Sequence, residues 1–184
     1  FQVYGTTGTA TPGTPISAFK QVAASTWEGG NAPAAALDGR TTTRWSSQFA
    51  DDQWLRVDFG GVAAVNQVVL NWEGAYARGY RLEVSNDAVN WTSIYTTTTG
   101  AGGTERLNVT GTGRYLRLFA TARATGFGVS LWEFQVFGTV DTSAATPPLL
   151  SPPTKAPAVT GRFALSAPAD NAMITSTRRP AFSW

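Results

Sequence analysis

The chain has 184 residues, with 14 Lys and Arg against 12 Asp and Glu, a formal net charge of +2, and neither histidine nor cysteine. The absence of these two residue types excludes Ser-His-Asp and Cys-His catalysis, and it excludes metal sites built from thiolate or imidazole ligands. The charge is small and the basic residues are scattered, which argues against a nucleic-acid partner, and no apolar run approaches the ~18 residues that a membrane span needs.

The rest of the composition favours strands and turns. The chain holds 19 Gly and 7 Trp, is rich in Thr, and has only 14% charged residues, a mixture that is poor in helix formers. We therefore expect an all-β binding module that works outside the cytoplasm. The sequence also opens without the charged and apolar regions of a signal peptide, which indicates an internal or trimmed piece.

The chain begins with a sequence that returns far downstream. Residues 1–6, Phe-Gln-Val-Tyr-Gly-Thr, recur as Phe-Gln-Val-Phe-Gly-Thr at 134–139. An alternating run that ends in Gly is typical of a last strand, so we interpret 1–6 as the closing strand of a preceding repeat. Residues 7–15 are Thr, Gly and Pro without periodicity and predict a linker, which leaves 16–138 as the complete module.

Within the module, alternating apolar and polar runs predict strands separated by turns. Tyr80, Leu82 and Val84 share one face of such a run, whereas Arg81 and Glu83 share the other, so the strands should be buried on one side only. Many short strands without a long amphipathic helix predict a sandwich or a barrel. Strands are expected at 16–25, 53–59, 65–72, 80–85, 91–96, 106–109, 114–119 and 131–137, with one helical turn over 32–37.

Beyond the module the composition changes again. Residues 139–161 are rich in Pro, Thr and Ala, with Pro pairs at 147–148 and 152–153, and should form a semi-stiff linker. Residues 162–184 contain two short apolar runs and predict the start of a further, incomplete β domain of immunoglobulin-like or fibronectin-like type. That segment is too short to bury a core of its own.

The loop that follows the helical turn carries a candidate ion site. Asp38 and Gly39 are followed by Thr43 and then by Trp45, whose ring can anchor the loop in the core. Calcium takes roughly 6 to 8 oxygen ligands from carboxylates, hydroxyls and carbonyls, and this turn offers all three kinds. It lacks the alternating acids of an EF-hand loop. The alternative is that Asp38 only caps the turn through its own backbone.

A series of short motifs runs through the module. They are Ala36-Leu37-Asp38-Gly39, Thr43-Arg44-Trp45-Ser46, Gln53-Trp54, Val57-Asp58-Phe59-Gly60, Trp72-Glu73, Tyr80-Arg81-Leu82-Glu83-Val84-Ser85, Arg114-Tyr115-Leu116-Arg117 and Ser130-Leu131-Trp132-Glu133-Phe134. In order and spacing they resemble the discoidin, or coagulation factor 5/8 type C, family in its bacterial carbohydrate-binding form, carbohydrate-binding module family 32. The resemblance implies a jelly-roll-like β-sandwich of about eight strands.

The resemblance also implies a structural calcium ion beside the Asp38 loop. A carboxylate inside the apolar strand at 131–137 is costly unless it is paired or metal-bound, which supports Glu133 as a ligand. One departure from the family is Ala88, which stands where the turn after Ser85 usually carries Gly. The implied ligands are the side chains of Asp38, Thr43 and Glu133 and the carbonyls of Ala35, Arg40 and Trp132.

In this family the sugar lies on loops at one rim of the sandwich, here 27–31, 46–52, 72–78 and 123–129. Sugar sites combine an aromatic face with polar groups that fix hydroxyls. Trp72 also continues the inward period of Val68 and Leu70, so it suits the core as well as a stacking platform, and the arginines suit ordinary solvated charges. The candidates are Trp27, Glu28, Trp72, Glu73, Tyr76, Arg78, Arg123 and Phe127, while Trp45, Trp54, Trp91 and Trp132 are assigned to the core or to support of the ion loop.

These features predict a non-catalytic module that holds a secreted bacterial polysaccharide hydrolase on its substrate, with a tandem module and a catalytic domain in the same parent chain. Carboxylates on the rim suit a cationic amino sugar, but Ser46 stands where chitosan-binding relatives often carry an acid. We therefore expect a β-glucan ligand, with chitosan as the alternative. A cell-surface or lipid adhesion module and a glycoside hydrolase are further alternatives.

Overall fold

The computed structural model describes residues 8–9 and 13–143. The chain divides into two units, 1–149 and 150–184, and all described residues belong to the first. The predicted closing strand at 1–6 and the predicted further domain at 162–184 lie outside the described residues. Within the described part, no helix has the length and apolarity that crossing a membrane requires.

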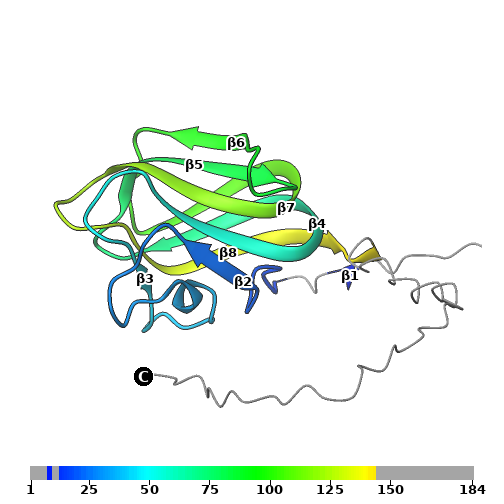
Figure 1. The fold of residues 1–184 in the computed structure, drawn as a ribbon, viewed down its shortest axis with the longest axis horizontal. Coiled ribbons are helices and arrows are strands. Elements are labelled where there is room, and N and C mark those ends of the chain that lie inside the picture. Colours follow the sequence, from blue (N-terminus) through cyan, green and yellow to red (C-terminus); the bar gives the residue numbers. More distant parts are fainter. Residues whose placement is uncertain (1–7, 10–12, 144–184) are drawn as a thin grey trace, which may run out of the picture. The chain divides into compact units, whose positions relative to one another are not determined.

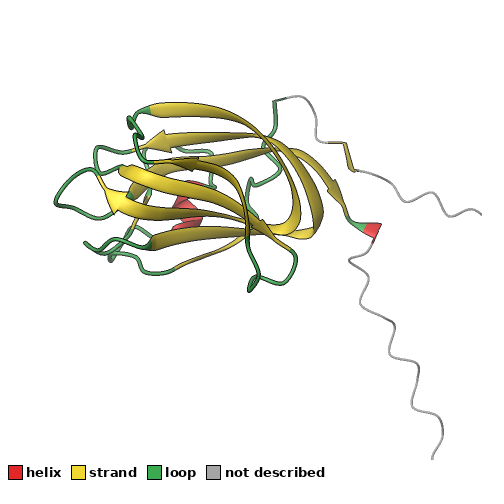
Figure 2. Ribbon diagram, turned by 90° about the horizontal axis from the view of Figure 1, so that it is seen from above, coloured by secondary structure: helices red, strands yellow, loops and turns green. Residues whose placement is uncertain are grey.

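The described residues form an antiparallel β-sandwich, as predicted (Figures 1 and 2). The strands hydrogen-bond in the order β1-β8-β4-β7-β5-β6, with β2 beside β4 and β3 beside β8. The elements are β1 Gly8–Thr9, β2 Gln21–Ala24, the 3-10 helix η1 Pro33–Ala36, β3 Trp45–Ser46, β4 Gln53–Trp72, β5 Ala77–Ser85, β6 Thr92–Thr97, β7 Thr104–Arg123 and β8 Ser130–Asp141. η1 confirms the predicted helical turn.

Two strands are much longer than the sequence indicates. β4 and β7 each span 20 residues, so each joins two runs that were predicted as separate strands. The β4–β7 register shifts between Asp58 and Ala63, where Gly60 has φ +78° and a Cβ on Gly61 would lie 2.3 Å from the backbone oxygen of Asp141. Glycine at such a position bends a strand and allows close backbone approach. The pairing therefore continues through the bend, and both strands curve from one layer into the other (Figure 1).

The start and end of the module also differ from the prediction. Ile16 and Ser17 form a turn before β2 instead of belonging to it. The Ile16 amide donates to the Val136 carbonyl (2.7 Å), and the Ser17 hydroxyl donates to the Phe134 carbonyl (3.1 Å). These bonds tie the turn to β8. β8 itself continues to Asp141, past the expected boundary at 138.

The core fills the space between the layers with alternate residues of each strand. Trp45, Tyr80, Phe59 and Phe134 are the largest fully buried side chains, and each such burial contributes about 2 kcal/mol. Trp45 thus belongs to the core, as predicted, and its position fixes the chain immediately before the rim loops.

The outer face of β5 and β7 is less solvated than predicted. Glu83 is 6% exposed and accepts hydrogen bonds from Arg81 (2.9 Å) and Arg117 (2.6 Å). The Arg117 guanidinium lies 4.1 Å from the ring centroid of Trp91 and 5.0 Å from that of Phe119. An arginine and aromatic layer therefore covers this face, and Trp91 belongs to that layer instead of the core. Trp54 and Trp132 are likewise half-buried and carry Arg56 and Arg44 over their rings.

Candidate functional site

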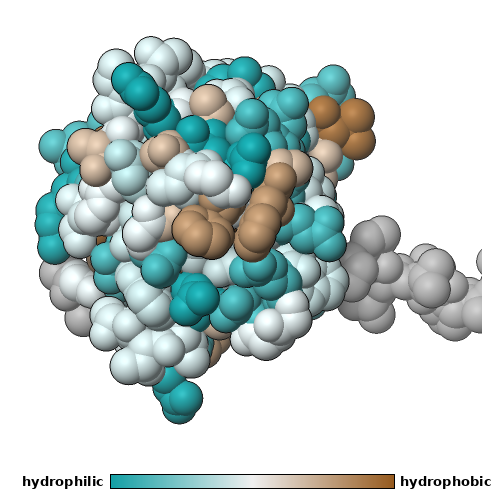
Figure 3. Space-filling model, turned by 90° about the vertical axis from the view of Figure 1, so that its left-hand side faces the viewer, coloured by the Kyte–Doolittle hydropathy of each residue, from teal (hydrophilic) through white to brown (hydrophobic). Residues whose placement is uncertain are grey.

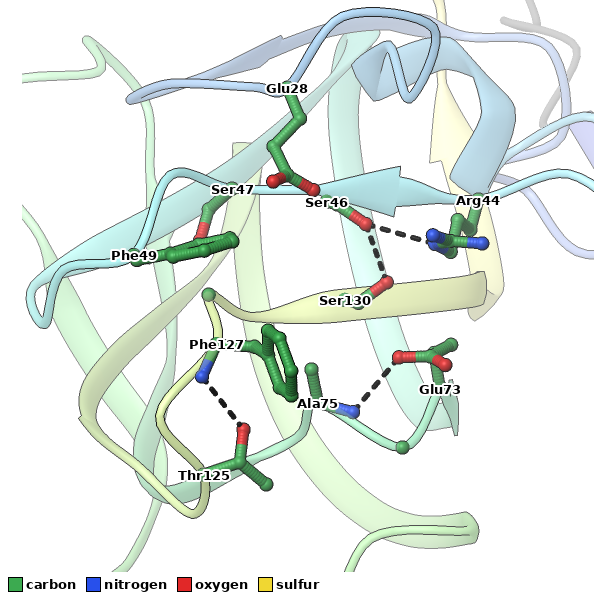
Figure 4. Close-up of a pocket in the computed structure, with 12 residues that line it drawn as sticks. Glu28, Arg44, Ser46, Ser47, Phe49, Glu73, Ala75, Thr125, Phe127 and Ser130 are labelled. Atoms are coloured by element: carbon green, nitrogen blue, oxygen red, sulfur yellow. Dashed lines mark hydrogen bonds between the residues drawn. The ribbon is translucent and has the colours of Figure 1, made fainter.

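A cavity opens at the end of the sandwich where the rim loops meet. Figure 3 looks onto this end and shows apolar side chains gathered near its centre among hydrophilic neighbours. The cavity has a volume of about 540 Å³, within the usual range for small-ligand sites. Its lining residues are Glu28, Arg44, Ser46, Ser47, Phe49, Glu73, Gly74, Ala75, Thr125, Phe127, Gly128 and Ser130 (Figure 4).

The floor of the cavity is a rigid junction between β3 and β8. Ser46 pairs with Ser130 across the two strands, and their hydroxyl oxygens lie 2.8 Å apart. Ser47 then exchanges two bonds with Val129, since its amide donates to the Val129 carbonyl (2.8 Å) and its hydroxyl accepts from the Val129 amide (2.8 Å). A Cβ on Gly128 would lie 2.2 Å from the Ser47 carbonyl oxygen, so only glycine permits this approach.

Two carboxylates line the cavity from separate loops. The backbone amides of Glu28 and Glu73 donate to the carbonyls of Ser46 (2.9 Å) and Ser130 (3.1 Å), so both glutamates are anchored to the floor. Glu73 also accepts one bond from the Ala75 amide (2.9 Å). Among the described residues, neither Glu28 nor Glu73 has a Lys or Arg nitrogen within 4.0 Å of its carboxylate. Both predicted residues are therefore brought together with their charge available to a ligand.

Arg44 supplies the positive charge of the cavity. Its Nε donates to the Ser46 hydroxyl (3.0 Å), and its guanidinium carbon lies 5.4 Å from the ring centroid of Trp132. These two contacts orient the guanidinium beside the floor while leaving other N–H groups free to donate. With Glu28 and Glu73, the charged groups of the cavity carry one net negative charge.

Two phenyl rings form the apolar wall. Phe49 and Phe127 are 57% and 63% exposed, and their ring centroids lie 5.7 Å apart in an edge-to-face arrangement. Figure 4 shows both rings across the cavity from Arg44. Exposed rings that support each other can pack against the apolar side of a sugar. Phe127 was predicted, whereas Phe49 was missed.

Arg123 supports this wall instead of lining the cavity. Its backbone amide and its Nε both donate to Asp51 Oδ1 (3.0 Å each), and its Nη1 donates to the carbonyls of Gly126 (3.3 Å) and Phe127 (3.1 Å). These hydrogen bonds, first from the Arg123 amide and then from its side chain, hold the pKa of Asp51 below its usual range. Arg123 therefore fixes the loop that carries Phe127.

Three other predicted residues lie outside the cavity lining. Trp72 is 3% exposed, its Nε1 donates to Glu105 (3.3 Å), and its ring contacts Tyr80 edge-on at 5.5 Å. A buried indole cannot offer its face to a sugar, so its assignment as a ligand residue is corrected to the core. Tyr76 is half-buried against the core, and Arg78 is exposed on β5 without reaching the cavity.

Trp27 lies beside the main cavity, in an adjoining hollow. The sequence also missed Arg44, Ser46, Ser47, Thr125 and Ser130 as lining residues. Phe49 could have been found, because a large apolar residue on a polar rim loop without periodicity has no core role to explain it. The serines gave no such signal, since small hydroxyl residues are common in any loop.

The predicted ion site brings Asp38, Thr43 and Glu133 to one place. The Thr43 hydroxyl donates to Asp38 Oδ2 (2.7 Å), and the Arg40 amide donates to Asp38 Oδ1 (2.9 Å), which is also the bond of the simple turn cap. Glu133 is 5% exposed, and its buried Oε1 has no hydrogen-bond partner. Burial, and next the charge of Asp38, raise the pKa of Glu133 to about 7.

This donor set fits a hard cation. The buried Oε1 of Glu133 has no hydrogen-bond partner, and the neighbouring carboxylate of Asp38 adds a second negative charge without a cation to balance the two. Calcium binds carboxylate, hydroxyl and carbonyl oxygens together. The part of the chain that the structure describes contains no group of three or more His, Cys, Asp or Glu suited to a metal. Among the described residues, Asp38 and Glu133 would therefore be the two carboxylates of a calcium site here. The carbonyl ligands expected from Ala35, Arg40 and Trp132 remain predictions.

Comparison with known proteins supplies the family. The family described as "NedA-like, galactose-binding domain", of the F5/8 type C group, matches residues 35–118. The chain is 44% identical to chitosan-binding module 1 from a chitosanase/glucanase of Paenibacillus sp. IK-5, covering 67% of this chain and 98% of that module with a TM-score of 0.65. Module 2 of the same enzyme, solved in complex with chitotriose, is 39% identical over 67% of this chain and 99% of that module, again with a TM-score of 0.65.

A curated relative is much longer. It is the polysaccharide lyase 8 family protein HylA of Enterococcus faecalis, 41% identical over 68 residues, which are 37% of this chain and 5% of that protein. The match thus spans about a twentieth of the lyase. The sandwich fold, the family match and near-complete coverage of two solved modules agree, and the chain therefore belongs to the discoidin-like, or factor 5/8 type C, family of carbohydrate-binding modules.

Proposed function

We propose that the module binds a cationic amino-sugar polysaccharide, with chitosan as the first candidate. The observation that carries this proposal is the pair Glu28 and Glu73, which line one cavity without a cationic partner among the described residues. An ammonium group pairs with a carboxylate through a charge-assisted hydrogen bond. Phe49 and Phe127 would contact the apolar side of the ring, and Arg44 would donate to hydroxyl oxygens.

The preference for a neutral β-glucan rested on Ser46, and the structure weakens that reason. Ser46 is 4% exposed and its hydroxyl is already engaged with Arg44 and Ser130. An acid at that position is not needed, because Glu28 and Glu73 supply carboxylates from two other loops. A β-glucan remains the second candidate, since carboxylates also accept hydrogen bonds from sugar hydroxyls.

Affinity electrophoresis through gels that contain chitosan, laminarin, galactan or no polymer tests this proposal. We expect retardation by chitosan, with Glu28→Gln and Glu73→Gln each weakening binding by roughly 10-fold, because each replaces a charge-assisted hydrogen bond to the ammonium group with a neutral one. Asp52→Asn is the control for a lost carboxylate, because Asp52 is exposed and lies outside the cavity lining. Retardation by laminarin alone, unchanged in both cavity variants, would replace the amino sugar with a β-glucan.

We further propose that the module serves a secreted bacterial polysaccharide-degrading enzyme as a non-catalytic targeting module. A shallow rim site of this kind binds weakly, with Kd on the order of millimolar to tens of micromolar. A tandem copy, suggested by the repeated sequence at 1–6, would raise the apparent affinity through effective concentration. Binding of the full parent chain would then be tighter than that of the isolated module.

Calcium is proposed as the structural ion of the Asp38 loop. Asp38, Thr43 and Glu133 would hold it, and the ion would supply the positive charge that the buried Oε1 of Glu133 lacks. The consequence concerns stability, because Glu133 lies on β8 and Asp38 on the loop before β3. An ion between them would link the two segments that build the cavity floor.

A further inference from the structure

A second hollow adjoins the main cavity at the rim. It has a volume of about 510 Å³ and is lined by Trp27, Glu28, Gly29, Gln48 and Phe49. Glu28 and Phe49 also line the main cavity, so the two hollows lie next to each other and share one wall. A ligand long enough to fill both would pass over that wall.

Trp27 is exposed and yet firmly held. Its side chain is 53% exposed, whereas the backbone on either side of it is fixed. The Trp45 indole donates to the Thr26 carbonyl (3.1 Å), the Gln48 amide donates to the Thr26 hydroxyl (3.0 Å), and the Glu28 amide donates to the Ser46 carbonyl (2.9 Å). An indole presented on an ordered loop loses little freedom when it binds, and its large face suits a sugar ring.

We propose that Trp27 forms a second sugar subsite, so that the module binds an internal stretch of a polysaccharide chain and not a single terminal residue. This inference rests on the proposed carbohydrate function. One sugar would occupy the main cavity between Glu73 and the phenyl wall, and a neighbouring sugar along the chain would stack on Trp27. Glu28, in the shared wall, would reach both, and the side-chain carboxamide of Gln48 would hydrogen-bond hydroxyls of the second sugar.

The arrangement makes affinity depend on ligand length. A single sugar would gain contacts in one hollow only, whereas a longer oligosaccharide would gain the stacking contact as well. Removing the indole should therefore affect long ligands and leave short ones unchanged. A residue that only held the main cavity in shape would instead weaken ligands of every length by the same factor.

Isothermal titration with chitosan oligosaccharides of increasing length tests the inference. Trp27→Ala should bind the shortest detectable ligand as the unaltered module does and lose roughly 10-fold for longer ones, the value of one aromatic contact. Phe19→Ala is the matched control, because Phe19 is 79% exposed and lies outside both hollows; it should change nothing. Circular dichroism melting checks that each variant is folded.

The outcomes separate this inference from the proposed function. The second subsite would be overturned if Trp27→Ala weakened binding equally at every ligand length, or at no length. Loss of binding in Glu73→Gln would still leave the proposed function standing. If the unaltered module binds no chitosan oligosaccharide, the same series with laminarin oligosaccharides decides. A length-dependent loss there would retain the subsite with a neutral ligand, and no binding there either would overturn both.

Discussion

Glu133 provides the sharpest test of the ion site, because ionising it should destabilise the protein without calcium and stabilise it with calcium. The pKa of Glu133 is raised from 4.5 to about 7 by burial and by Asp38. A folded-state pKa above the unfolded value means that the contribution to stability is fully present below pH ~4.5 and is lost as pH rises through ~7. In chelator at about pH 8 the ionised group should therefore cost about 3 kcal/mol, or roughly 10 °C in Tm.

The assay is thermal unfolding in chelator and in calcium between about pH 5 and pH 8. We expect Tm to fall with pH in chelator only. Glu133→Gln, which has no charge to bury, should lose this fall and should no longer respond to calcium, whereas Glu28→Gln should behave as the unaltered protein does. The reasoning is refuted if chelator leaves Tm unmoved at every pH, or if Glu133→Gln retains the calcium response.

Three further changes test other parts of the structure. Gly128→Ala should lower the free energy of unfolding in urea by about 1–3 kcal/mol, because the added Cβ would overlap a backbone oxygen of the facing loop. Gly126→Ala is the control and should cost far less, since no atom lies within 4 Å of its added Cβ. Equal losses in the two variants would contradict the close packing at Gly128. The Arg114 guanidinium holds the pKa of Asp58 below its usual range through a two-bonded ion pair at 2.9 Å. This ion pair contributes on the order of 1 kcal/mol or less to stability, which is present above pH ~4 and is lost as the pH falls further. Asp58→Asn should therefore flatten the decrease in stability at acid pH. An unaltered decrease would count against the pair. Ala88 has φ +60°, so Ala88→Gly should raise stability by up to about 1 kcal/mol, and a loss in urea unfolding would show that this turn is not strained.

Periodicity predicted most of the fold because the strands alternate between core and surface. It failed where glycine allows two outcomes. Gly60 and Gly61 predicted a break between two strands, yet the β4–β7 pairing continues past them. Glycine is required there for a different reason, because β4 bends and its backbone approaches that of β8 closely. Sequence alone cannot distinguish a strand that ends from a strand that bends, since both place small, φ-tolerant residues at the same point.

The outer face shows a second limit of pattern reading. Glu83 follows the polar phase of its strand, which predicts exposure, but arginines and aromatic rings from neighbouring strands cover it. Such coverage depends on cross-strand register, and register is a tertiary property. Trp72 shows the same limit, because its position in the alternating pattern suits a core residue and a rim residue equally, and only its burial in the structure assigns it to the core.

The candidate site was predictable where a residue type had no structural reason to be present. Glu28, Glu73 and Phe127 lie on turn-rich loops without periodicity, and the structure places all three around one cavity. Arg123 lies on the correct loop, but its partner Asp51 is 72 positions away in the sequence, so its supporting role could not be seen. Phe49 lies on a rim loop as Phe127 does and lines the same cavity, so the reasoning that identified Phe127 would also have identified Phe49.

The central claim is that Glu28 and Glu73 bind the ammonium groups of an amino sugar. It is tested most directly by isothermal titration of one chitosan oligosaccharide before and after chemical N-acetylation, at a pH where the free amines are protonated. Acetylation removes the positive charge and keeps the sugar chain, so we expect binding of the free amine form and a loss of roughly 10-fold or more after acetylation. Equal affinity for the two forms would contradict the claim, because the carboxylates would then not be recognising charge.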